Sequence, residues 1–99
     1  MNKLKEFAKE VSIDIPIDKM YLFGSQVKGR VHKDSDVDLL LVSKKFRRKR
    51  WIKRPIPLYD KWNIDKPVDF VCLTPEEFEK SKKVPSIAQE AVKRGIRII

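Results

Sequence analysis

Two aspartates one residue apart, Asp36 and Asp38, are the residues of this 99-residue chain best suited to chemistry. Successive side chains of a β-strand alternate between faces, so aspartates at positions i and i+2 point the same way, about 6 to 7 Å apart. Carboxylates this close repel each other unless a cation lies between them. Because hard cations prefer oxygen ligands, the pair predicts a site for Mg²⁺, with Mn²⁺ as the second choice.

A third carboxylate, Asp69, stands near the start of another apolar run, Val68 to Leu73. If this run forms a strand beside the one that carries Asp36 and Asp38, the three carboxylates come together. Such an arrangement is typical of sites where one or two metal ions hold a phosphoryl group during in-line displacement. Cys72 has the opposite parity to Asp69, so we expect it to face away and pack in the core.

Two structural explanations of the aspartates stay open. Asp34, Ser35 and Asp36 are residue types that favour turns and helix caps, and a turn explains the first two of them fully. Asp38 is harder to explain in this way, because a charge inside an apolar strand is disfavoured without a partner. Pairing with one of the many Lys or Arg residues remains an alternative to metal binding.

The dipeptide Gly24-Ser25 follows an apolar run and could hold a phosphate. Glycine turns the chain sharply and lets a phosphate approach the backbone, while the serine offers an N–H and a hydroxyl. A plain strand-to-loop turn is the alternative. The glycine spacing of residues 24–31 resembles a Walker A loop, but Arg30 and Val31 stand where Lys and Ser or Thr are required, which excludes a P-loop.

Apolar periodicity predicts the main elements that must position these residues. Spacing at i, i+3, i+4 and i+7 predicts an amphipathic first helix whose apolar face is formed by Leu4, Phe7, Ala8 and Val11. Continuous apolar runs predict three buried strands, at Met20 to Phe23, Val37 to Val42 and Val68 to Leu73.

Capping and spacing signals predict two more helices. Ile56, Tyr59 and Trp62 lie at helical spacing, although two prolines interrupt the pattern. Thr74-Pro75-Glu76-Glu77 has the sequence of a capping box that opens a short helix.

The C-terminal residues predict one further helix and one strand. The helix begins near Pro85, ends at Gly95 and has an apolar face formed by Ile87, Ala88, Ala91 and Val92. Residues 96–99 are expected to form a terminal strand. The order of elements predicts an α+β (α/β) fold, with a small mixed sheet flanked by helices.

Length and composition predict one soluble domain spanning residues 1–99. The single cysteine excludes an internal disulfide framework and suits a reducing compartment. The start of the chain lacks the apolar stretch of a secretory signal, and no apolar run is long enough to cross a membrane. We therefore expect a cytoplasmic protein without a membrane partner, while its oligomeric state, including a homo-oligomer, stays open.

Charge is concentrated in one segment, Lys44 to Arg54. The chain carries a net charge of +9, from 23 basic and 14 acidic residues, and eight of the basic residues lie here without an acid. Phe46 and Trp51 are interleaved with them, a pattern that can bind phosphates and stack a base. The segment could instead be a solvated basic surface anchored by the two aromatic rings, dock an acidic protein, or attract a nucleoside triphosphate.

Taken together, Gly24-Ser25, ten intervening residues, Asp36-Val37-Asp38 and a later strand with Asp69 resemble the polymerase-beta superfamily of nucleotidyltransferases. The chain is most similar to the minimal nucleotidyltransferases, small prokaryotic proteins that often act as antitoxins beside a helical HEPN partner. The three predicted strands lie where that fold needs strands, so the resemblance covers most of the chain and implies a polymerase-beta-like nucleotidyltransferase fold.

The resemblance implies a function and a role for each site residue. Asp36 and Asp38 would bind Mg²⁺ ions, and Asp69 would help to hold the second metal and activate the attacking hydroxyl. Gly24 and Ser25 would cradle the triphosphate. The reaction would be transfer of a nucleoside monophosphate, AMP from ATP, to a hydroxyl of a protein or RNA, with a HEPN-type protein as the expected partner.

One position departs from the family pattern. Many relatives carry an arginine directly after Gly-Ser, whereas this chain has Gln26, and Lys28 or Arg30 would have to supply the positive charge for the nucleotide. Two other functions follow from the same residues: a catalytically degenerate antitoxin that only binds its partner, and an RNA-binding protein that acts through Lys44 to Arg54.

Overall fold

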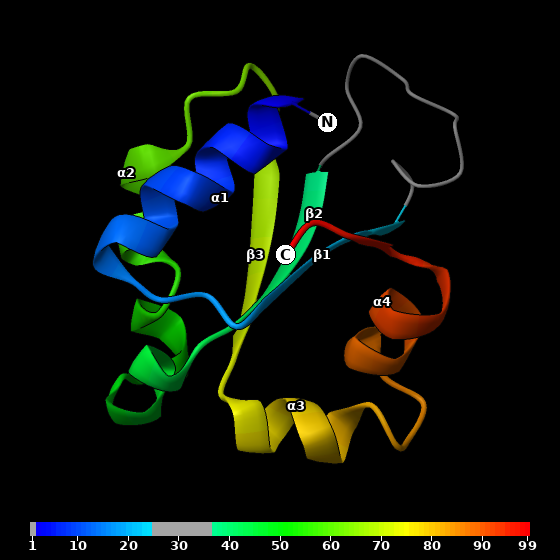
Figure 1. The fold of residues 1–99 in the computed structure, drawn as a ribbon. Coiled ribbons are helices and arrows are strands. Elements are labelled where there is room, and N and C mark those ends of the chain that lie inside the picture. Colours follow the sequence, from blue (N-terminus) through cyan, green and yellow to red (C-terminus); the bar gives the residue numbers. More distant parts are fainter. Residues whose placement is uncertain (1, 25–36) are drawn as a thin grey trace.

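A mixed β-sheet forms the centre of the computed structural model, which describes residues 2–24 and 37–99 (Figure 1). In these residues the strand order is β3-β2-β1-β4. β1 pairs antiparallel with both β2 and β4, whereas β2 and β3 are parallel. The strands are β1 (Lys19–Phe23), β2 (Val37–Val42), β3 (Val68–Leu73) and β4 (Ile96–Arg97). The predicted mixed sheet and the bounds of two predicted strands, β2 and β3, are confirmed.

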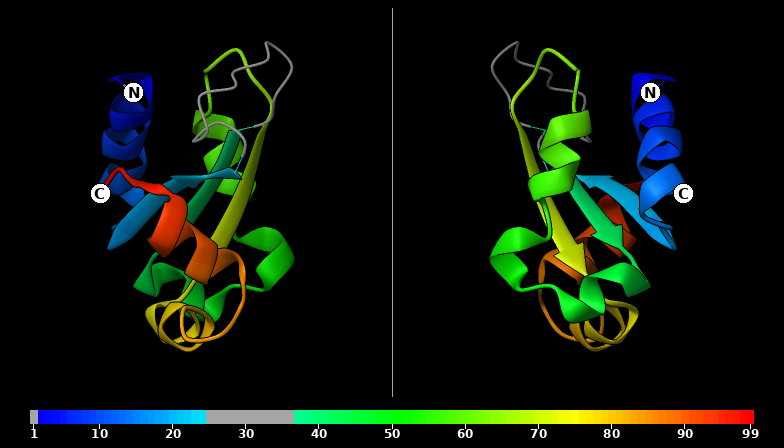
Figure 2. Two further views of the ribbon diagram at one scale, coloured as in Figure 1. Left: turned by 90° about the vertical axis from the view of Figure 1, so that its right-hand side faces the viewer. Right: turned by 90° about the vertical axis from the view of Figure 1, so that its left-hand side faces the viewer.

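Helices cover both faces of the sheet. One face packs against α1 (Asn2–Asp14) and α2 (Ile56–Lys61), and the other against α3 (Pro75–Ser81) and α4 (Ile87–Arg94). Figure 2 shows the sheet between these two groups. None of the helices in the described part of the chain is long and apolar enough to span a membrane.

Strand β2 is buried on both faces, as its apolar run predicts. Leu39 and Leu41 belong to the core on the α1 side, while Leu40 and Val42 belong to the core on the α3 and α4 side. All four side chains are at most 2% exposed. This alternation also shows which face of the sheet each remaining residue of the strand points to, including Asp38.

The predicted face of the first helix is confirmed, whereas that of α2 needs correction. Leu4, Phe7, Ala8 and Val11 are the buried residues of α1. In α2 the buried residue is Leu58, and Ile56 is 55% exposed. Trp62 packs against the core, whereas Tyr59 is 47% exposed, although both rings lie edge-on to Phe70. Pro55 and Pro57 flank Ile56 at the first turn of the helix.

α3 begins where its capping box predicts, and α4 begins two residues after the predicted Pro85, at Ile87. Thr74 Oγ1 accepts a hydrogen bond from the Glu77 N–H, and Glu77 Oε1 accepts one from the Thr74 N–H, so the capping box is complete. Gly95 ends α4. The apolar face of α4 is narrower than predicted: Ala88 and Ala91 are buried, whereas Ile87 and Val92 are about half exposed. The terminal strand is confined to β4, Ile96–Arg97.

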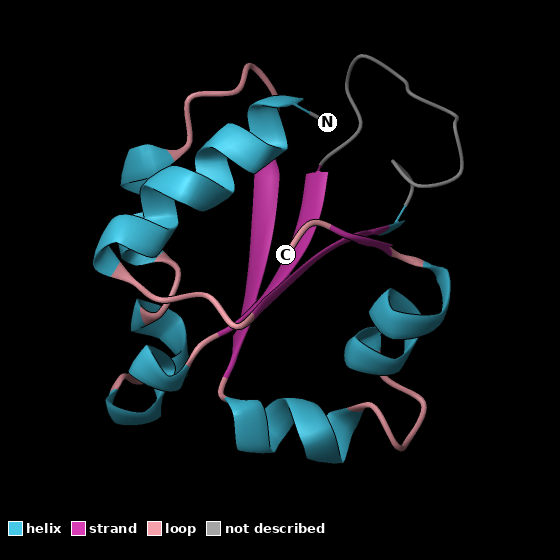
Figure 3. Ribbon diagram, viewed as in Figure 1, coloured by secondary structure: helices cyan, strands magenta, loops and turns pink. Residues whose placement is uncertain are grey.

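The connection from β2 to β3 carries the basic segment. Two short 3-10 helices, η2 (Lys44–Arg48) and η3 (Trp51–Lys53), follow β2 and lead into α2. Figure 3 shows this helical connection leaving one end of β2 and returning to the opposite end of the sheet, where β3 starts. The parallel pairing of β2 and β3 requires such a crossover.

Candidate active site and the basic surface

The parallel ladder of β2 and β3 brings two predicted site residues side by side. Asp38 and Asp69 are direct register partners. Neighbouring strands lie about 4.8 Å apart, and register partners point to the same face. Asp38 shares its face with Leu40, and Asp69 shares its face with Val71, on the side of the sheet covered by α3 and α4. Two carboxylates therefore stand next to each other at the heads of adjacent strands.

The chain turns closely over one of these carboxylates at Gly24. Gly24 directly follows β1 and has a φ of +83°, a conformation that L side chains rarely adopt. A Cβ at this position would lie 2.4 Å from Asp38 Oδ2. A glycine is required here both for the turn and for the close approach of its backbone to the Asp38 carboxylate.

The pair is open to solvent. Asp38 is half-buried and Asp69 is exposed. The neighbouring donors are carboxylate oxygens, which fit a hard cation such as Mg²⁺ and do not suit a soft metal. No cluster of three or more His, Cys, Asp or Glu residues with metal-binding geometry occurs in residues 2–24 and 37–99.

The other predicted site residues, Ser25, Lys28, Arg30 and Asp36, lie outside the described residues. Asp36 immediately precedes β2, two residues before Asp38. Its role as the third carboxylate stays a prediction.

Cys72 lies on the face opposite to Asp69, as its parity predicts. Its side chain is 2% exposed and belongs to the core on the α1 side. Burial raises the pKa of the Cys72 thiol to about 12, although the nearby Arg54 guanidinium acts in the opposite direction. The thiol therefore stays protonated at neutral pH and contributes to packing.

Comparison with known proteins assigns the family. The sequence model of the nucleotidyltransferase domain matches residues 2–98. The chain belongs to the nucleotidyltransferase domain family. This confirms the resemblance to polymerase-beta-like nucleotidyltransferases and the expectation of a transferase domain.

One solved structure shows the same fold, and a second matches less well. A proposed nucleotidyltransferase from Sulfolobus solfataricus superposes with a TM-score of 0.67 at 24% identity, over 97% of this chain and 76% of the other. A second proposed nucleotidyltransferase has 31% identity and a TM-score of 0.49, over 84% of this chain and 87% of the other. A search of curated protein sequences finds no significant match.

At the opposite end of its sheet, this nucleotidyltransferase domain carries the basic segment. Ser43 caps η2 by accepting a hydrogen bond from the Lys45 N–H, and its hydroxyl donates to the Pro16 carbonyl. Phe46 is fully buried. The predicted anchoring by two aromatic rings is half correct: Phe46 enters the core, but Trp51 is 56% exposed.

The second anchor is Arg54, which sequence reasoning grouped with the solvated cations. Its side chain is only 8% exposed. Nη1 donates to the Cys72 carbonyl at 3.0 Å and to Glu77 Oε1 at 2.7 Å, and Nε donates to the Lys49 carbonyl at 3.1 Å. Arg54 thereby ties the basic segment to the end of β3 and to the capping box of α3.

The Arg54 contact also sets the ionisation of its partner. Burial alone would raise the pKa of the Glu77 carboxyl, but hydrogen bonds from the Arg54 guanidinium and the Thr74 N–H outweigh burial and lower it. The Arg54 guanidinium and the Thr74 N–H therefore keep the Glu77 carboxylate ionised. A glutamate that closes a capping box could signal such a contact in the sequence, but nothing in the sequence identifies the arginine that meets it.

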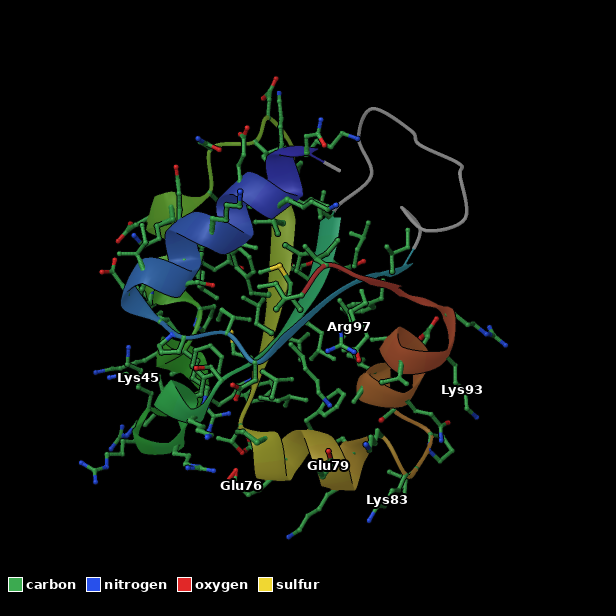
Figure 4. All side chains as sticks on the ribbon, in the orientation of Figure 1. Lys45, Glu76, Glu79, Lys83, Lys93 and Arg97 are labelled. Atoms are coloured by element: carbon green, nitrogen blue, oxygen red, sulfur yellow. The ribbon has the colours of Figure 1, made fainter. Side chains whose placement is uncertain are left out.

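Most of the remaining cations of the segment point into solvent. Arg47 pairs with Glu76, with both side chains about half exposed. Figure 4 shows Lys45 directed away from the ribbon at this end of the molecule. No acidic side chain within the described part of the chain pairs with the other exposed cations, Lys44, Lys45, Arg48, Lys49, Arg50 and Lys53.

Proposed function

We propose that this domain transfers a nucleoside monophosphate, AMP from ATP, to a hydroxyl of a protein or RNA acceptor. The observation that carries the proposal is the pairing of Asp38 with Asp69 at the heads of two parallel strands, with Gly24 turning over the Asp38 carboxylate. The acceptor oxygen would form a bond to the α-phosphorus, and the bond between that phosphorus and the bridging oxygen would break to release pyrophosphate.

The carboxylates of Asp36, Asp38 and Asp69 would hold Mg²⁺. When bound, the metal neutralises charge on the phosphate oxygens and aligns the reacting groups. Gly24 and Ser25 would bind the triphosphate through backbone N–H groups and the serine hydroxyl. Lys28 or Arg30 would add positive charge to the same turn.

Asp69 would act on the acceptor. It is the more exposed of the two described carboxylates and lies on an adjacent strand at the level of Asp38. A carboxylate there can accept the proton of the attacking hydroxyl as the new bond forms, and can orient that hydroxyl beforehand. Asp38, which is half-buried against Gly24, is better suited to hold the metal.

The direct test measures transfer of label from α-labelled ATP, in the presence of Mg²⁺, to candidate acceptors. A HEPN-type helical protein is the first acceptor to try, because the resemblance to minimal nucleotidyltransferases implies such a partner, followed by RNA. Asp38→Asn should lower the rate at least about a hundredfold, because one metal-binding carboxylate supplies several kcal/mol of transition-state stabilisation. Asp60→Asn, an exposed aspartate on α2, is the matched control.

Metal binding provides a readout that does not depend on finding the acceptor. Titration of the protein with Mn²⁺, followed by electron paramagnetic resonance, should show a site that is weakened by Asp38→Asn and by Asp69→Asn but not by Asp60→Asn. Equal Mn²⁺ binding, or equal label transfer, by the wild type and the Asp38→Asn variant would contradict the proposal.

A further inference from the structure

A groove separate from the carboxylate pair lies on the basic segment. It has a volume of about 430 Å³, enough for a nucleotide, and is lined by Arg48, Lys49, Arg50, Lys53, Ile56 and Pro57. Four of these six side chains are cationic, and the other two are apolar. A groove with cationic walls and an apolar patch matches an anion that also carries a flat apolar group.

The cations of this groove are available to a ligand. Arg47 and Arg54 of the same segment are each engaged by a glutamate of α3. By contrast, the four cations that line the groove are exposed and form no ion pair with any described acidic residue. Cations that are not neutralised within the chain leave a strong local positive potential, which attracts polyanions.

An exposed aromatic ring lies in the same segment. Trp51 is 56% exposed, and the Arg54 guanidinium lies 5.5 Å from the centre of its ring. Arg54 is itself fixed by three hydrogen bonds, so it supports the ring from one side. A tryptophan held in this way among cations offers a stacking surface for an unpaired base.

We propose that this groove and Trp51 bind single-stranded RNA. The cations would contact phosphates, and Trp51 would stack on a base. A protein partner fits less well, because lysine is depleted in protein interfaces, whereas cations dominate this groove. A duplex keeps its bases stacked inside, so only a single strand can use the ring, and unpaired bases are the normal state of RNA loops and ends.

The RNA surface is distinct from the proposed catalytic site. Asp38 and Asp69 lie at the starts of β2 and β3, and a single residue, Ser43, separates the end of β2 from the basic segment. Six residues of strand span about 20 Å, so the two regions lie at opposite ends of the sheet (Figure 1). RNA binding should therefore need neither Mg²⁺ nor ATP, and failure of either proposal leaves the other standing.

The test measures binding of a fluorescent 12-nucleotide RNA without secondary structure, by anisotropy across a range of salt concentrations. A variant with Gln at Arg48, Lys49, Arg50 and Lys53 should bind at least about a hundredfold more weakly at low salt. The slope of log K against log salt should fall by about 3, since each phosphate contact contributes about 0.7 for single strands. The control variant places Gln at four exposed lysines elsewhere, Lys3, Lys5, Lys80 and Lys93.

The stacking contact is tested separately. Trp51→Leu should weaken binding about tenfold without changing the salt slope, while Trp51→Phe should retain most of the affinity. Asp38→Asn should bind RNA like the wild type. Thermal melting of each variant checks that the fold is retained, so a lost affinity can be attributed to the surface.

Competition identifies the ligand class. Unlabelled single-stranded RNA should displace the probe, while duplex RNA of the same length and a polyglutamate peptide of equal charge should compete much less. Equal loss of affinity in the two four-glutamine variants would overturn the proposal, as would duplex RNA, single-stranded DNA or polyglutamate that competes better than single-stranded RNA.

Discussion

The two ends of strands β2 and β3 carry opposite charges and are held in place by different means. At the starting end, the parallel ladder sets Asp38 and Asp69 side by side, since they are register partners. At the far end, the basic segment is positioned by one buried side chain, Arg54. The comparison teaches that a substitution at the carboxylate end should change chemistry, whereas one at Arg54 should change stability.

The largest stability effect is expected at Arg54. Arg54→Met removes the guanidinium donor of the Cys72 carbonyl and leaves Glu77 Oε1 with the Thr74 N–H alone, and should lower the free energy of unfolding by about 3 kcal/mol. Arg47→Met is the matched control, because its pair with Glu76 is half exposed and should contribute less than about 1 kcal/mol. Urea unfolding measures both. Similar losses of unfolding free energy in Arg54→Met and Arg47→Met would show that Arg54 stabilises the fold no more than an exposed arginine does.

Gly24 is expected to give the next largest effect, and to link stability to chemistry at the carboxylate end. Gly24→Ala places a Cβ against Asp38 Oδ2 and keeps a strained φ, and should cost about 2 kcal/mol. Removing the Asp38 carboxylate by Asp38→Ala relieves the clash with the new Cβ, but the positive φ at position 24 remains unfavourable for alanine. The double variant with Asp38→Ala should therefore lose less stability than the sum of the single changes, as measured by a double-mutant cycle. If the stability losses of Gly24→Ala and Asp38→Ala were strictly additive, the close approach of Gly24 to the Asp38 carboxylate would be contradicted.

A smaller effect should appear in the acid stability of the anchored end. The lowered pKa of Glu77 stabilises the fold fully above the ordinary value of 4.5, and this contribution is lost as the pH falls through the lower folded value. Glu77→Gln should therefore be less stable than the wild type at pH 7, by under about 1 kcal/mol after solvent screening, with the difference shrinking toward pH 3. Urea unfolding at several pH values tests this. A stability difference between the wild type and Glu77→Gln that grows as the pH falls would contradict a lowered pKa of Glu77.

The smallest expected effect is the labelling of Cys72 by a thiol reagent in the native protein. Since Cys72 is buried and its thiol pKa is raised to about 12, a disulfide reagent at pH 8 should label it only through opening of the fold. Labelling in Arg54→Met should accelerate about tenfold for each 1.4 kcal/mol of stability lost, while Arg47→Met should behave like the wild type. Rapid labelling of the native wild type would show that the thiol is accessible.

The sequence predicted those parts of the fold that depend on local pattern. The bounds of β2 and β3 follow from continuous apolar runs, and the start of α3 from its capping box. The predicted face of α2 was wrong at Ile56 and Tyr59, because the spacing of apolar residues does not reveal which ones pack against the sheet. The pairing of Asp38 with Asp69 could be proposed from parity and strand order, but its register depends on long-range pairing.

Arg54 shows why the rest of the site was not predictable. In the sequence it is one of eight basic residues between Lys44 and Arg54, and no local signal separates it from the others. Its burial depends on three acceptors that come from different elements: the carbonyls of Lys49 and Cys72, and the carboxylate of Glu77. Contacts of this kind are determined only when the elements have packed.

The crossover between β2 and β3 makes the two ends of this domain separately adjustable. The register of Asp38 with Asp69 is fixed within the ladder, whereas residues 43–67 have only to leave one end of the sheet and return to the other. Provided that Phe46 and Arg54 keep their places, the exposed residues between them can change without moving a carboxylate. A protein engineer could therefore graft a different recognition sequence onto this crossover while leaving the nucleotidyltransferase site intact.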